Sequence, residues 1–144
     1  MADVERKQNI GVLRWPADCN DAAMSLTITS RKSNEIEILV LSGRLTLGEG
    51  TGALRETARK ALDSGADILV DLSGVDYIDS AGLGELVSAY ASAAARGRHV
   101  KLLRPLKRVD SLLHITKMYS TFEIFEDEAS AIASFQTSHI ENDK

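Results

Sequence analysis

The sequence predicts a single α/β domain with a mixed, mostly parallel sheet of about five strands and about four helices, in the order β-β-α-β-α-β-α-β-α. Residues 68–72 form a short run that is apolar almost throughout, as expected for a strand covered on both faces. Residues 83–94 then repeat apolar side chains at helical spacing, so strand and helix alternate. The 144 residues suffice for one domain, and 44% apolar but only 5% aromatic residues favour an aliphatic core.

Two extended segments open the predicted domain. Residues 24–29 alternate apolar and polar side chains, which is the pattern of a strand with one buried face. Ser33 and Asn34 predict a turn into a second strand over residues 36–41, whose later half is apolar on both faces. We expect the two strands to pair as a hairpin, which makes this part of the sheet antiparallel.

The first two helices are predicted from their apolar spacing and their glycine ends. A helix over about residues 49–64 ends at Gly65, and the helix that begins near residue 82 ends at Gly97, because glycine readily adopts the left-handed conformation that terminates helices. The predicted buried stripe of the first helix is Leu54, Ala58, Ala61 and Leu62. The predicted buried stripe of the second is Leu83, Leu86, Val87, Tyr90, Ala91 and Ala94.

The remaining predicted elements are shorter. A strand over residues 100–103 ends before Pro105, and a helix over about residues 106–116 follows it. A short strand over residues 122–125 precedes a last helix, for which Asp127 is a suitable N-cap. The buried side chains expected on these two helices are Val109, Leu112, Leu113, Ala131, Ile132 and Phe135. Right-handed crossovers are expected to join the parallel strands.

The predicted domain covers residues 24–137. Residues 1–23 lack a clear period and are interrupted by Trp15 and Pro16, so we interpret them as an N-terminal extension outside the core. Residues 138–144 are predicted to be a polar C-terminal tail.

Composition argues against several classes of function. The net charge of −4, from 17 basic and 21 acidic residues, disfavours a nucleic-acid binder, which concentrates positive charge on one face. No apolar run approaches the roughly 18 residues needed to cross a bilayer. The single cysteine cannot form a disulfide within the chain. We therefore expect a cytoplasmic protein that does not insert into a membrane.

No catalytic, cofactor or metal site is expected. The nucleophile elbow of hydrolases needs glycine two residues before the serine, and Ile78 occupies that position before Ser80. The glycine-rich run over residues 48–52 lacks the Lys-Ser/Thr pair of a phosphate-binding loop. The cysteine and the histidines lack metal-ligand spacing: Cys19, His99, His114 and His139. A binding protein is therefore predicted rather than an enzyme.

The most informative loop leads into the helix that begins near residue 82. Its sequence is Asp79-Ser80-Ala81-Gly82-Leu83-Gly84. A phosphate on Ser80 would lie at the N-terminus of this helix, which tolerates an anion, and would add about −1.5 to −2 charges. A partner that docks there would be repelled, so the loop suits a switch. The simpler alternative is that Ser80 only caps the helix. Glu85, Ser88 and Ser92 are expected to be exposed beside a docked partner.

The same loop carries a resemblance to a known family. The run from Leu69 to Gly84 resembles the signature of the STAS-domain anti-sigma-factor antagonists, and residues 79–84 (Asp-Ser-x-Gly-Leu-Gly) are its most specific part. Residues 41–45, 100–103 and 112–113 also fall where that family has matching residues. The resemblance covers about residues 24–137 and implies a single STAS-like domain.

The resemblance also implies a function in bacterial transcription regulation. A family member binds an anti-sigma factor, commonly a serine-protein kinase, and thereby releases a sigma factor. The kinase phosphorylates the serine that matches Ser80, which switches binding off, and a serine phosphatase reverses the modification. The partner-binding residues that the resemblance implies are Asp79, Ala81, Gly82, Leu83, Gly84, Thr46 and Glu85. Thr46 departs from the family, which often has an aspartate there, so the choice of partner and the modification of Ser80 stay open.

Two other functions stay open. The first is a scaffold or transporter-associated STAS module whose Ser80 is never phosphorylated. The second is an anion- or nucleotide-binding module that uses a local basic cluster: Arg96, Arg98, Lys101, Arg104, Lys107 and Arg108.

Overall fold

In a computed structural model of the protein, the structure describes the backbone of residues 26–142 and the side-chain environment of residues 26–136. The predicted extension over residues 1–23 and the first two residues of the predicted hairpin lie outside the described residues. In the described range, each helix is either too short or too polar to span a bilayer.

Among the described residues, five strands form one sheet in the order in which they occur along the chain. They are β2 (Leu26–Ser33), β3 (Ile36–Leu45), β4 (Asp67–Ile78), β5 (Val100–Leu103) and β6 (Ile124–Phe125). β2 and β3 pair antiparallel around a turn at Asn34, whose φ is 59°, and all later pairs are parallel. The predicted fold class is confirmed, including the hairpin.

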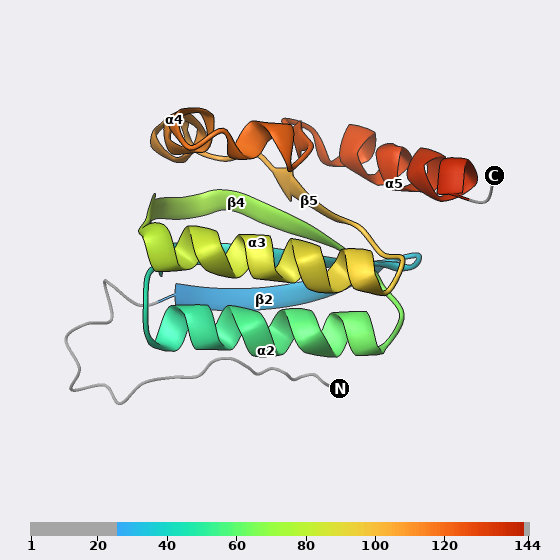
Figure 1. Ribbon diagram of the computed structural model, residues 1–144, viewed down its shortest axis with the longest axis horizontal. Coiled ribbons are helices and arrows are strands. Elements are labelled where there is room, and N and C mark those ends of the chain that lie inside the picture. Colours follow the sequence, from blue (N-terminus) through green and yellow to red (C-terminus); the bar gives the residue numbers. More distant parts are fainter. Residues whose placement is uncertain (1–25, 143–144) are drawn as a thin grey trace.

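In the described part of the chain, four α-helices cover the sheet. They are α2 (Glu49–Asp63), α3 (Ser80–Ala95), α4 (Lys107–Ile115) and α5 (Glu128–Asn142), with a short 3₁₀ helix, η2 (Met118–Ser120), before β6. α2 and α3 lie side by side on one face, and α5 lies apart from them (Figure 1). Gly65 and Gly97 follow α2 and α3 with φ of 89° and 73°, which confirms the predicted helix ends.

Alternating side chains of the central strands divide the core into two layers. On β4, Ile68 and Val70 face the large cluster under α2, α3 and α4, whereas Leu69 faces a smaller cluster. The smaller cluster packs against Ala131 and Phe135 of α5, so α5 covers the opposite face of the sheet. Each layer is mainly aliphatic, in agreement with the composition.

The predicted buried face of α3 is confirmed at Leu86 and wrong in the second half of the helix. Ala91 and Ala94 are exposed and Tyr90 is 37% exposed, while Leu83 and Val87 are half-buried. The buried residues are Gly82, Glu85, Leu86, Ala89 and Ala93. α3 packs against α2 as well as against the sheet, so the face it buries is turned toward α2 and takes in small residues.

β4 is longer than the predicted strand, which ended at Leu72. It continues to Ile78 by pairing with the second half of β3, although Ser73 and Asp76 are exposed. Two register shifts in this pairing accommodate the additional residues. The extension carries the chain to the end of β3, so that the loop starting at Asp79 lies beside the β3–α2 connection.

Two ion pairs lie on the face of the sheet that α5 covers, and one of them connects β2 to the start of α5. Arg31 of β2 donates to Glu128 at 2.7 Å, and Arg104 Nη2 lies 3.1 Å from Oδ2 of the buried Asp71. Burial raises the pKa of Asp71, but hydrogen bonds from Ser73 and Arg104 outweigh it and bring the pKa below its ordinary value. The hydrogen bond from Arg31 lowers the pKa of Glu128.

These two carboxyl groups make the stability fall in acid. Because both pKa values are lower in the folded chain, the unfolded chain binds more protons as the pH falls. Their contribution is complete above the unfolded values near pH 4 and is lost as the pH drops through the folded values. Urea unfolding should therefore show a lower midpoint at about pH 3 than at about pH 6. Asp71→Asn should flatten this dependence, and the exposed control Asp76→Asn should not; equal slopes for both variants would contradict the assignment.

Candidate functional site

Asp79 joins the two loops that form the candidate site. Its Oδ1 accepts a hydrogen bond from the N–H of Gly82 at 2.8 Å and thereby caps α3. Its Oδ2 accepts from the N–H of Leu47 at 3.1 Å, and its own N–H donates to the carbonyl of Leu45 at 3.2 Å. The end of β3, the β3–α2 connection and the start of α3 are thus fixed to one carboxylate.

Ser80 is the first residue of α3 and is exposed. The alternative that Ser80 caps the helix was wrong, because the side chain of Asp79 makes the capping bond. Within residues 26–142, no acceptor bonds the N–H groups of Ser80 and Ala81. The hydroxyl therefore stands on the open end of a helix whose dipole favours negative charge.

The two glycines after Ser80 differ completely in their surroundings. A Cβ on Gly82 would lie 2.3 Å from the carbonyl oxygen of Leu45 and 2.9 Å from Ile78, whereas a Cβ on Gly84 would meet nothing within 4 Å. Gly82 is buried and lets α3 approach the end of β3. The expectation that Gly82 offers surface to a partner was wrong, and Gly84 is the glycine that remains exposed.

An exposed leucine lies in the connection that Asp79 joins to the start of α3. Leu47 is 77% exposed, and its N–H bonds to the residue before Ser80. The half-buried Thr46 precedes it, and the half-buried Leu83 lies one helical turn beyond Ser80. Sequence reasoning missed Leu47, because an apolar residue between Thr46 and Gly48 has no period that marks it as exposed. The site therefore has an apolar part beside its hydroxyl.

Glu85 does not belong to the exposed surface. It is only 6% exposed, and its carboxylate forms two hydrogen bonds with Arg55 of α2, at 2.8 and 3.3 Å. The expected exposure of Glu85 was therefore wrong, because α2 supplies a cation that covers it. Ser88 and Ser92 are exposed, as expected.

The predicted basic cluster is divided among internal partners. Arg96 pairs with Asp63 at 2.8 Å, and Arg104 pairs with Asp71 on the α5 side. Lys101 is 4% exposed and bonds to Ser134. These three side chains do not form one cationic surface, which removes support from an anion-binding module. Among the described residues, no three histidine, cysteine or acidic side chains are placed to hold a metal ion.

Comparison with known proteins decides the family. A family model described as "Mlab, STAS domain" matches residues 28–120, which is more than half of the chain. The chain belongs to the STAS domain family. The matched residues include both loops that Asp79 connects.

Individual STAS proteins show how far the similarity extends. The anti-sigma-B factor antagonist of Bacillus subtilis (strain 168) is 31% identical over 94 residues, which cover 65% of this chain and 85% of the relative. A putative anti-sigma factor antagonist from Thermotoga maritima has the same fold, with a TM-score of 0.71 at 22% identity over 76% of this chain and 94% of that one. The resemblance to the anti-sigma-factor antagonists is confirmed.

The STAS fold also occurs as part of a much larger protein. The murine Solute Carrier 26 family member A9 anion transporter matches with a TM-score of 0.62 at 16% identity. The match covers 74% of this chain but only 18% of that chain. The fold alone therefore does not distinguish an antagonist from a module of a transporter.

Proposed function

We propose that the chain is an anti-sigma factor antagonist. It binds an anti-sigma factor, of the serine-kinase class, through the surface formed by the β3–α2 connection and the start of α3. Binding releases a sigma factor, and phosphorylation of Ser80 prevents it. Under this proposal the chain is a substrate and binding module rather than an enzyme, it acts in the cytoplasm, and a serine phosphatase restores the active form.

One observation carries the proposal: Asp79 fixes an exposed hydroxyl and an exposed apolar side chain on one surface. Ser80 lies at an anion-tolerant helix end, and Leu47 is 77% exposed beside it. Leu47 can bury apolar area in a partner, which stabilises a complex by roughly 25 cal/mol per Å². A phosphate on Ser80 adds charge to the rim of the same contact without breaking any bond that holds the loop. The named relatives that are anti-sigma factor antagonists support this function class.

Leu47 provides a test of the binding surface. Leu47→Asp should weaken binding of the anti-sigma factor by about thirtyfold or more, because it replaces a buried apolar contact with a charge that must be desolvated. The unfolding temperature should stay nearly unchanged, since Leu47 is exposed in the free chain. Isothermal titration with the captured partner measures the affinity.

Ile115→Asp is the matched control, because Ile115 is 76% exposed but lies at the end of α4. It should retain the affinity of the parent chain. If both aspartates weakened binding equally, the contact would not be centred on the β3–α2 connection. Capture of the partner from native lysate, followed by mass spectrometry of Ser80, identifies the partner class and the modification.

The second candidate is an unphosphorylated scaffold in a transport complex. The presence of this fold as part of an anion transporter is compatible with it. Thr46, where the antagonist family often has an aspartate, is also compatible with it. Recovery of membrane transport components in the same capture, with unmodified Ser80, would support this candidate over the antagonist.

A further inference from the structure

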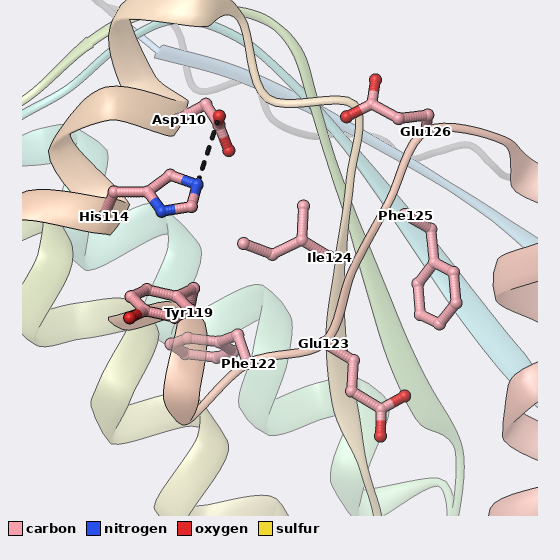
Figure 2. Close-up of a pocket in the computed structure, with 8 residues that line it drawn as sticks. All are labelled: Asp110, His114, Tyr119, Phe122, Glu123, Ile124, Phe125 and Glu126. Carbon is pink, nitrogen blue, oxygen red and sulfur yellow. Dashed lines mark ion pairs between the residues drawn. The ribbon is translucent and has the colours of Figure 1, made fainter. Parts of the chain in front are cut away.

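A groove on the β6 side of the sheet is remote from Ser80 in the sequence and unused by the proposed function. It has a volume of about 580 Å³ and lies between α4, η2 and β6 (Figure 2). The aromatic and aliphatic part of its lining is Tyr119, Phe122, Ile124 and Phe125. The polar part is Asp110, His114, Glu123 and Glu126.

The groove opens along an unpaired strand edge. Among the described residues, β6 is the last strand of the sheet and has β5 as its only neighbour. The carbonyls of Glu123 and Phe125 accept hydrogen bonds from β5, at 3.0 and 2.7 Å. In a parallel ladder, alternate residues direct their backbone groups to the same neighbour, so the N–H and C=O of Ile124 point away from β5. An additional strand can therefore pair with Ile124.

The side chains around this edge favour a ligand that presents an apolar side chain next to a positively charged one. Figure 2 shows the side chain of Ile124 directed into the groove, between the sheet and His114, whereas Phe125 points away from it. Phe122 packs edge-on against Tyr90 at 5.4 Å between ring centroids, which fixes the base of the groove. Tyr119 is 51% exposed, although its ring packs against that of His114 with 4.8 Å between the ring centroids, so the remaining part of the ring is accessible to an aliphatic or cationic side chain.

The charge of the lining is one-sided. It contains three carboxylates and, in the described part of the chain, no lysine or arginine. Glu123 is paired with Lys101 at 3.1 Å, and Asp110 lies 3.6 Å from the Nε2 atom of His114. Among the described residues, Glu126 has no ion-pair partner, and it is exposed immediately after β6. A positively charged group near Glu126 would therefore gain an electrostatic partner.

We propose that this groove binds an extended segment of a partner protein that carries an apolar residue and, two positions away, a basic residue, so that both side chains project to the same face as Ile124 and Glu126. The segment adds a strand to β6 by pairing with Ile124, places an apolar side chain against Ile124 and Tyr119, and directs lysine or arginine toward Glu126 and Asp110. This gives the chain a second docking surface, made of residues that the surface around Ser80 does not use. The chain can then hold a second protein while its switch is free, occupied or phosphorylated.

The test uses the full chain and a short, capped, fluorescent peptide in which every second residue is threonine and the positions between them are valine and lysine in turn, so that valine and lysine lie two positions apart on one face. Fluorescence polarisation should show saturable binding with a dissociation constant of about 10–100 μM. Replacing one valine with N-methylvaline removes a backbone donor and should weaken binding by about tenfold. The corresponding peptide with glutamate in place of lysine should not bind.

Matched variants locate the site. Glu126→Gln should weaken peptide binding by about two- to fivefold, and the double variant with Asp110→Asn by about tenfold. Glu35→Gln removes the same charge from the exposed β2–β3 turn and should leave the affinity unchanged. Unfolding temperatures of the variants should match that of the parent chain, because these side chains are exposed or half-buried.

Three results would overturn the proposal. Equal weakening by Glu35→Gln would mean that the peptide only senses net charge. Unchanged binding of the N-methylated peptide, or displacement by free arginine amide at equal concentration, would mean that the groove takes a small cation instead of a strand. Absence of saturation up to millimolar peptide would mean that the groove does not dock such a segment. None of these results bears on Ser80, so the proposed function is tested separately.

Discussion

Phosphorylation of Ser80 should weaken binding of the anti-sigma factor by several hundredfold, and Ser80→Glu by about a hundredfold. A partner that binds near 1 μM has a binding free energy of about −8 kcal/mol, and repulsion with steric exclusion at the contact costs about 3–4 kcal/mol. Ser80→Ala should bind like the unmodified chain and resist the kinase. Titration of purified partner against the four forms measures these affinities.

The fold itself should not respond to this charge. The capping bond of α3 comes from Asp79 and not from Ser80, and the helix end favours an anion. Far-UV circular dichroism and the unfolding temperature should therefore be the same for the phosphorylated and unmodified chains.

Ser92→Glu is a suitable control for Ser80→Glu, because it adds the same charge to an exposed position of the same helix, about 18 Å further along. It should reduce the affinity by less than about threefold. Equal affinities of the parent, Ser80→Glu and phosphorylated chains would exclude the switch.

Gly82→Ala should destabilise the protein strongly, and Gly84→Ala should not. At Gly82 the new methyl group would meet the carbonyl of Leu45 at 2.3 Å, so α3 must move away from β3. We expect a loss of about 3 kcal/mol, which lowers the unfolding temperature by roughly 10 °C. At Gly84 the methyl group meets nothing within 4 Å, and alanine favours the helix by up to about 1 kcal/mol, so the unfolding temperature should rise.

The two glycine variants also distinguish effects on stability from effects on partner binding. Gly84→Ala adds a methyl group to the exposed start of α3, where the proposed partner approaches, so the affinity should fall by about tenfold although the fold becomes more stable. Calorimetric unfolding and titration with the partner check the two effects. A destabilising Gly84→Ala, or a Gly82→Ala that unfolds at the parent temperature, would show that the packing of α3 on β3 is different from that described.

Most of the fold was predictable because the spacing of apolar residues and the residues that end helices and strands indicate the same elements. In α2 the stripe that contains Leu54 and Ala58 is buried as predicted, and the glycine ends of α2 and α3 are confirmed. The hairpin followed from alternation and from the turn at Asn34. The length of β4 was not predictable, because residues 73–77 are largely polar and are held by pairing with β3 rather than by their own preference.

The face of α3 and the details of the site depended on distant contacts. Alanine occupies both the exposed and the buried sides of α3, so Ala93 and Ala94 cannot be distinguished by hydrophobicity alone. Glu85 is buried only because Arg55, 30 residues earlier, reaches its carboxylate. Ser80 was predicted as a candidate site residue from its sequence motif. Leu47 was not, because its place beside the start of α3 depends on a hydrogen bond to Asp79, 32 residues later.

The sequential order of the strands has a consequence for biosynthesis. Each strand pairs with the strand that precedes it along the chain, so every newly made strand emerges next to the edge it joins. All residues that make the Asp79 junction lie before residue 96, at the end of α3. The surface around Ser80 can therefore be complete on the ribosome while β5, β6 and α5 are still being translated.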